Sequence, residues 1–166
     1  MAYPTESCFG LGCDPRQHAA IRRILGAKRR GWWHGLILIG ARLSHLLRYV
    51  NVDDVLLAPA VESWPGPHTW LLPARPAVSR WLRGRHSSVA VRITGHPDAA
   101  RLCQAVGGAI VSTSANRRGA APTKTQLETQ QRFGQLVDYV LPGRIGGLAN
   151  PTEIRDAATR AVIRTG

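Results

Sequence analysis

The chain has 166 residues, 44% of them hydrophobic, and its 22 Lys and Arg against 10 Asp and Glu give a formal net charge of +12. This length suits one globular domain with a sizeable core, and no apolar run approaches the roughly 18 residues that a membrane span needs. The basic balance favours polyanionic partners such as nucleotides or nucleic acid, although a solubilising basic surface explains the charge equally well.

The N-terminal residues and the cysteines indicate a reducing compartment. Met1–Glu6 contains neither a basic nor an apolar segment, so no secretory signal peptide is predicted. The three cysteines, Cys8, Cys13 and Cys103, are too few and odd in number for a disulfide framework, which fits the cytoplasm. With His18, the first two lack the paired spacing of a zinc site, so we favour packing and predict no metal site.

The first half of the chain alternates between predicted elements. Residues 1–13 are expected to begin extended and to run into a turn over Phe9–Pro15. Apolar residues at helical spacing predict a helix over Gln17–Ala27, whose basic end at 28–30 suits the helix dipole. The elements expected next are a strand at 35–39, a helix at 41–49, a rigid turn at 64–67 and a strand at 68–73.

The second half continues this alternation. The expected elements are a strand at 88–93, a helix at 97–105, a strand at 109–111, a helix at 126–133, and strands at 137–141 and 161–164. No repeat, low-complexity tract or linker interrupts the series. The pattern predicts a single mixed α/β domain.

The stretch after the strand at 109–111 carries the strongest local signal for chemistry. Ser112–Asn116 supplies hydroxyls and an amide, and Arg117, Arg118 and Gly119 follow directly. Such groups at the end of a strand can form a cradle for a phosphate or an oxyanion. The alternative interpretation is a polar turn that merely ends the strand.

Several familiar nucleotide and hydrolase motifs are missing. There is no Walker-type loop, and Gly10-Leu11-Gly12 lacks the third glycine of a dinucleotide fingerprint. No Gly-x-Ser-x-Gly elbow and no paired carboxylates for acid–base work appear. A nucleotide would therefore have to bind through a different loop.

Several motifs occur together in one order, and each is weak alone. They are Tyr3–Gly12, Lys28-Arg29-Arg30, Trp64–Pro67, Val89–Arg92 with His96-Pro97, Ser112–Asn116, and Asn150–Asp156 near the end. The series resembles the YrdC-type threonylcarbamoyl-AMP synthases, the TsaC family, over essentially the whole chain. The resemblance implies one YrdC-like α/β domain over residues 1–166, with a twisted mixed β-sheet, packed helices and a basic concave surface.

The resemblance also implies an activity. The family forms threonylcarbamoyl-AMP and pyrophosphate from L-threonine, bicarbonate and ATP, and a partner complex then transfers the threonylcarbamoyl group to tRNA. We therefore expect a cytoplasmic nucleotidyltransferase of tRNA modification, with Mg²⁺ as the counter-ion of its ATP. Two alternatives stay open: a non-catalytic protein of this fold that binds double-stranded RNA, tRNA or rRNA, and a carbamoyl-adenylate-forming relative like the YrdC-type domain of hydrogenase maturation proteins.

The matched motifs suggest site residues, because attack on the α-phosphate builds charge that cations and hydroxyls can stabilise. The expected catalytic residues are Lys28, Arg30, Ser114 and Asn116. The expected ATP contacts are these four with His34, Ser88 and Arg164. The expected threonine contacts are Ser7, Arg92, Ser112 and Thr152, with the Arg92 guanidinium matching the carboxylate. The alternatives are a solvated helix end for Lys28 and Arg30, and backbone-bonded hydroxyls for Ser7 and Thr152.

The chain also departs from the family pattern. It starts almost at the first strand, so the leading helix of relatives is expected to be absent. Gly31 stands where relatives usually have proline, which should free the loop after Arg30. Trp32 and Trp33 are expected to pack over that loop or to stack on a base. Arg118 replaces a small hydroxyl residue and adds charge beside the nucleotide loop.

Overall fold

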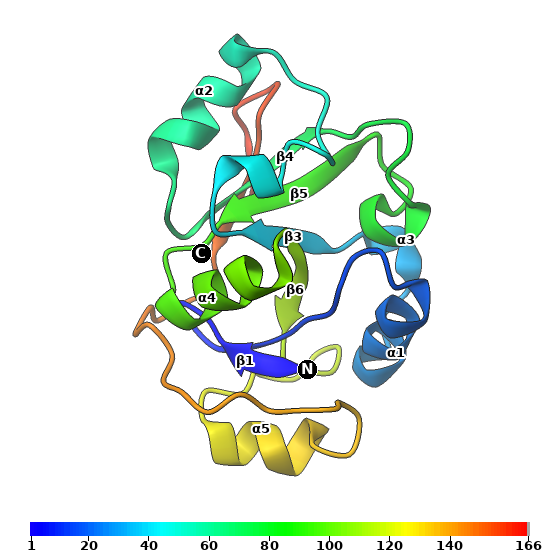
Figure 1. Cartoon of the computed structure of the whole chain (residues 1–166), viewed down its shortest axis with the longest axis vertical. Coiled ribbons are helices and arrows are strands. Elements are labelled where there is room, and N and C mark those ends of the chain that lie inside the picture. The colour runs from blue at the N-terminus through cyan, green and yellow to red at the C-terminus, as the bar shows by residue number, and fades with distance from the viewer. Residues whose placement is uncertain (166) are drawn as a thin grey trace.

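A twisted eight-stranded mixed sheet runs through the computed structural model, which describes residues 1–165 (Figure 1). Its strands are β1 (Ala2–Pro4), β2 (Phe9–Leu11), β3 (Ile37–Gly40), β4 (His68–Pro73), β5 (Ser88–Ile93), β6 (Ile110–Ser114), β7 (Glu153–Asp156) and β8 (Val162–Arg164). Across the sheet the order is β1-β2-β6-β3-β5-β4-β7-β8. The pairs β3–β5 and β4–β7 are parallel and the others antiparallel. The first and last strands therefore lie at opposite edges.

Five helices and two 3-10 turns accompany the sheet in residues 1–165, and capping residues mark the ends of some of the helices. They are α1 (His18–Lys28), α2 (Asp54–Ser63), α3 (Arg80–Arg83), α4 (Pro97–Val106) and α5 (Gln126–Phe133), with 3-10 turns η1 (Trp32–His34) and η2 (Leu43–His45). Asp53 caps α2 by accepting the Leu56 N–H at 2.8 Å. Helix α4 starts at Pro97 and stops at Gly107, whose φ of 69° suits glycine. No helix within residues 1–165 is long and apolar enough to cross a membrane.

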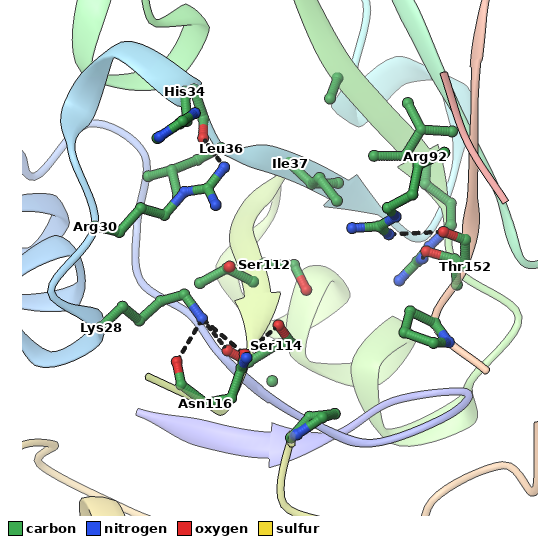
Figure 2. Close-up of a pocket in the computed structure, with 18 of the residues that line it drawn as sticks. Lys28, Arg30, His34, Leu36, Ile37, Arg92, Ser112, Ser114, Asn116 and Thr152 are labelled. Atoms are coloured by element: carbon green, nitrogen blue, oxygen red, sulfur yellow. Dashed lines mark hydrogen bonds between the residues drawn. The ribbon is translucent and has the colours of Figure 1, made fainter. Parts of the chain in front are cut away.

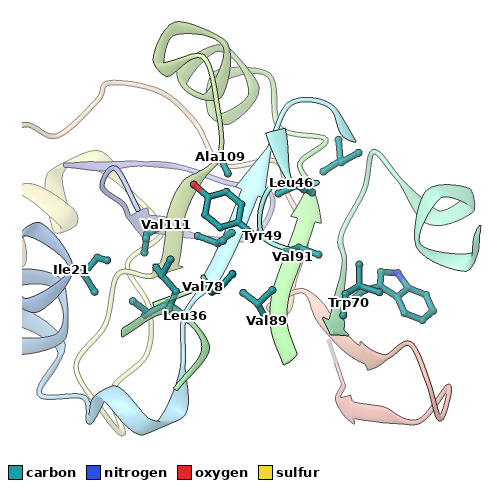
Figure 3. Close-up of a cluster of buried hydrophobic side chains, with 14 of the residues drawn as sticks. Ile21, Leu36, Leu46, Tyr49, Trp70, Val78, Val89, Val91, Ala109 and Val111 are labelled. Carbon is teal, nitrogen blue, oxygen red and sulfur yellow. The ribbon is translucent and has the colours of Figure 1, made fainter. Parts of the chain in front are cut away.

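Buried side chains cover both faces of the sheet, because neighbours along a strand point to opposite sides. In β3, Leu38 joins the larger cluster and Ile39 the smaller; in β6, Val111 and Ile110 divide in the same way. The larger cluster includes side chains of α1, α2 and β5, and Figure 3 shows part of it. The smaller cluster includes Ala99 and Cys103 of α4. The central strands are thus packed on both faces by these two clusters, and this packing holds the residues at the strand ends in place.

Most of the predicted elements are confirmed, with the same or nearly the same bounds. The strands at 68–73 and 88–93 and the helix at 126–133 match to the residue, and the helices at 17–27 and 97–105 match within one residue. The strands at 35–39 and 161–164 begin one or two residues later than expected. These are the segments with the clearest periodicity and capping residues.

Other expectations were wrong. The segment 41–49 forms only η2 and turns, because the chain must bring Val50 to its bridge with Ala74 instead of extending a helix. Residues 137–141 make a single bridge, Val140 to Ala2, and no strand. The expected turn at Phe9–Pro15 begins as strand β2. Helices α2 and α3 and strand β7 were not predicted at all.

Candidate functional site

A cavity of about 620 Å³ opens where the ends of β5 and β6 meet the end of α1, the β1–β2 turn and the last two strands. Figure 2 shows Lys28, Arg30 and Asn116 on one side of it and Arg92 and Thr152 on the other. The cavity lining includes every residue selected from the sequence: Ser7, Lys28, Arg30, His34, Ser88, Arg92, Ser112, Ser114, Asn116, Thr152 and Arg164. Their roles stay predictions, but the chain brings all of them to one cavity.

The amino group of Lys28 is bound to the polar loop after β6. Its Nζ donates to the Ser114 carbonyl at 2.5 Å, to the Asn116 carbonyl at 2.9 Å and to Asn116 Oδ1 at 3.1 Å. The Ser114 hydroxyl donates to the same Oδ1 at 2.6 Å. Lys28 therefore links the end of α1 to the loop and places a positive charge beside Ser114 and Asn116.

Burial and the neighbouring Arg30 lower the pKa of Lys28 to about 8. This side chain is almost fully buried, so its charge is weakly screened by solvent. The solvated helix end considered from the sequence is therefore wrong for Lys28. Arg30 is half-buried: one Nη donates to the Gly35 carbonyl at 3.3 Å, and its Nε is buried without a partner.

The opposite side of the cavity is built around Arg92 of β5. Its Nη1 donates to the Thr152 hydroxyl at 2.6 Å, and its Nη2 donates to Glu6 Oε2 at 3.1 Å. The Nε atom is buried with no partner. The Arg164 guanidinium donates to the Thr152 carbonyl at 2.7 Å, so β8 is tied to the same group.

The remaining predicted residues occupy positions between these two ends. Ser112 lies inside β6, and Ser7 lies in the β1–β2 turn; both are buried. Ser88 is the first residue of β5, and His34 closes the exposed turn η1. Burial, Arg30, Arg118 and His86 lower the pKa of His34 below its ordinary range. The hydroxyls of Ser112–Ser114 belong to the strand itself, which extends further than the sequence predicted.

Positive charge dominates the cavity. Its cationic lining residues are Lys28, Arg30, Arg83, Arg92, Arg118 and Arg164. No carboxylate lines it among residues 1–165, and no cluster of three metal-ligating side chains was found in that range. A site of this composition suits an anionic ligand with several phosphate oxygens.

Several residues that line the cavity were not predicted from the sequence. Arg83 ends α3 and His86 lies in the turn between α3 and β5, and the path of this segment brings both residues to the cavity. Leu36, Leu82 and Ile163 add an apolar wall and looked like ordinary core or edge residues. No pattern in the sequence could separate these side chains from others of their kind.

The unusual Gly31–Trp33 segment forms a packed outer wall. Trp32 packs on the core and on Trp81, with ring centroids 6.2 Å apart, and Arg80 lies 5.5 Å from its centroid. A Cβ at Gly31 would lie 2.3 Å from the Trp33 ring. The Trp33 ring therefore leaves no room for a side chain at position 31, where glycine fits. Of the two roles expected for these tryptophans, Trp32 has the packing role, while Trp33 is exposed.

Comparisons with known proteins find one family model and several similar proteins. The Sua5/YciO/YrdC family, described as "Telomere recombination", matches residues 1–166. The threonylcarbamoyl-AMP synthase of Nitrosococcus oceani is 51% identical over 165 residues, which cover 99% of this chain and 89% of that protein.

Two solved structures share the fold. The structure of P. abyssi Sua5 complexed with L-threonine has a TM-score of 0.86 and 28% identity, covering 93% of this chain and 46% of that chain. The structure of E. coli YciO has a TM-score of 0.87 and 29% identity, covering 99% of this chain and 82% of that chain. The overall fold is thus shared with both.

Proposed function

This chain belongs to the Sua5/YciO/YrdC family, and we propose that it is a threonylcarbamoyl-AMP synthase. The reaction joins L-threonine, bicarbonate and ATP into threonylcarbamoyl-AMP, pyrophosphate and water. It requires a carbamate oxygen of N-carboxythreonine to attack the α-phosphate while the bond to pyrophosphate breaks. The site must therefore hold a polyphosphate and a small amino acid in one cavity, with the reacting atoms close together.

The Lys28 side of the cavity would bind the polyphosphate. Lys28, Arg30 and Arg118 contribute positive charge to this side, and Arg118 N–H donates to the Lys28 carbonyl at 3.3 Å. Negative charge grows on the phosphate oxygens during the transfer, and fixed cations in a partly dry cavity stabilise it without reorganising. The Ser114 and Asn116 side chains bond to each other in the loop that anchors the Lys28 amino group. ATP accordingly binds with its phosphates over the Ser114–Asn116 loop.

The Arg92 side of the cavity would bind the amino acid. Arg92 would pair its guanidinium with the carboxylate of the amino acid, and the buried residues Ser7, Ser112 and Thr152 line the same cavity. The complex of P. abyssi Sua5 with L-threonine supports an amino acid as the ligand of this fold.

Magnesium would enter with ATP, held by phosphate oxygens and water. Within residues 1–165 the cavity offers no carboxylate to hold the ion directly. We expect the enzyme to work in the cytoplasm and to pass the adenylate to a tRNA-modifying threonylcarbamoyl-transfer complex. The net charge of +12 also favours contact with tRNA or another RNA, which should weaken steeply with salt.

The observation that carries this proposal is the convergence of Lys28, Arg30, Ser114 and Asn116 on one cavity with Arg92. A protein that merely binds RNA needs a continuous basic surface and no such cavity. The decisive experiment measures pyrophosphate release from ATP with bicarbonate and Mg²⁺, with and without L-threonine. Threonine-dependent release that disappears in Lys28→Ala and Ser114→Ala is expected. A folded chain that releases none, yet binds RNA, would favour the non-catalytic alternative.

A further inference from the structure

A buried carboxylate stands directly behind the cavity. Glu6 lies in the turn between β1 and β2, its side chain is 9% exposed, and it does not line the cavity. Its Oε2 accepts from Arg92, while its Oε1 accepts from the Thr94 hydroxyl at 2.7 Å and from the Gly95 N–H at 3.1 Å. Both oxygens of the carboxylate are thus used by β5 and the residues that follow it.

Glu6 is charged in this setting. Burial alone would raise its pKa, but the attraction of Arg92 and the hydrogen bonds from Thr94 and Gly95 outweigh burial and lower it. A buried ion pair contributes little net stability compared with apolar residues of the same volume. Stability is therefore a weak explanation for this pair.

The backbone of the same turn also fixes the loop that delivers Thr152. The Glu6 carbonyl accepts from Leu148 N–H at 3.0 Å, and the Thr5 carbonyl accepts from Gly146 N–H at 3.0 Å. Gly146 lies so close that a Cβ there would be 3.1 Å from the Glu6 backbone. Glu6 consequently contacts both segments that orient the Arg92 guanidinium, one through its carboxylate and one through its carbonyl.

The charges of the cavity give this pair a second consequence. Among the cationic lining residues within 1–165, Arg92 alone forms an ion pair with a carboxylate. Lys28 and Arg30 bond only to carbonyl and amide oxygens in this range. The charge of Arg92 is therefore compensated by a carboxylate, while the charges of Lys28 and Arg30 are not.

We propose that Glu6 is a positioning and specificity-determining residue: it fixes the plane of Arg92 and cancels its charge, so that a single carboxylate binds there in preference to a polyphosphate. This inference rests on the proposed function, because it needs both substrates in one cavity. Without the carboxylate, an uncompensated Arg92 would attract phosphate oxygens as strongly as its neighbours do. ATP would then compete for the place of the amino acid.

The test compares Glu6→Gln with the wild-type chain in threonine-dependent pyrophosphate release. The amide keeps the shape and an acceptor but removes the charge. We expect the KM for L-threonine to rise about tenfold, a typical effect of removing a side chain that supports a binding residue. The KM for ATP should change by no more than about twofold. In the variant, excess ATP should inhibit competitively against L-threonine. Thr94→Val, which removes one hydrogen bond to Oε1, should raise the same KM by a smaller factor.

Glu128→Gln is the matched control, because its carboxylate pairs with Arg132 on the surface of α5. It should leave both KM values unchanged. Three results in folded Glu6→Gln would overturn the inference without touching the proposed synthase activity. They are equal rises in both KM values, a fall in kcat alone, or unchanged kinetics. Should Glu6→Gln not fold, Thr94→Val decides: an unchanged threonine KM in that variant refutes the inference. Wild-type protein without threonine-dependent release and without calorimetric threonine binding would overturn the proposed function itself.

Discussion

Raising the pH should weaken ATP binding through Lys28. With a pKa of about 8, this amino group loses its proton in a range where the phosphates of ATP are fully charged. Such a group is about nine-tenths charged at pH 7 and about one-tenth charged at pH 9. If ATP binds only the charged form, the dissociation constant should rise about tenfold between these values.

The assay is calorimetric titration of ATP with Mg²⁺ into the protein, from pH 7 to pH 9.5, without threonine. Other groups near the cavity interfere little in this window: the pKa of His34 is lowered below 6.5, and burial raises the pKa of the Cys8 thiol above 9. Lys28→Arg keeps its charge at every pH and should bind with a flat profile, even where the longer side chain weakens binding overall. An unchanged dissociation constant in the wild type, or the same rise in Lys28→Arg, would refute the reasoning.

Four further outcomes are expected. Phe133→Ala, which empties a fully buried position, should cost about 3–5 kcal/mol of the unfolding free energy in urea titrations. Asp53→Ala removes the cap of α2 and should cost about 1 kcal/mol in the same titrations, without altering pyrophosphate release. Folding lowers the pKa of Glu6, so the ionised carboxylate stabilises the folded state above pH 4.5, and this stabilisation is lost as the pH falls through the pKa of the folded state. Glu6→Gln should therefore reduce the pH dependence of stability in this acid range, as followed by circular dichroism. Arg118→Ser should weaken ATP binding several-fold at low salt and less at high salt, as measured by calorimetry.

The strands and helices that the sequence predicted well are those with a complete local signal. Ser88–Ile93 alternates, and Gln126–Phe133 follows the capping residue Thr125, whose hydroxyl accepts from Glu128 N–H. Residues 41–49 carry apolar residues at helical spacing too, but the neighbouring strand pairing decides their path. Helix α2 was hidden by Pro59 inside it. Tertiary packing chose between local alternatives that the sequence leaves nearly equal.

The candidate site was predicted from motifs, and its geometry was not. Lys28, Ser114 and Asn116 were selected because they match motifs of the resembled family, but those motifs say nothing of the three bonds from Lys28 Nζ to the loop. Glu6 belongs to the Tyr3–Gly12 motif, but its role could not be predicted, because its partner Arg92 lies 86 residues away. Contacts between segments so distant in sequence depend on the order of strands in the sheet, which no local pattern specifies.

The cavity wall contains both the β1–β2 turn and strand β8, which lie almost a whole chain length apart. A ligand held by Ser7 on one side and Arg164 on the other acts as a reversible cross-link between these segments. Closing so long a loop in the unfolded chain is costly in entropy, about 4–5 kcal/mol for a covalent link of roughly 100 residues. Opening at either edge of the sheet would break this cross-link, so substrates that contact both segments would hold the two edges of the sheet together as one cooperative unit.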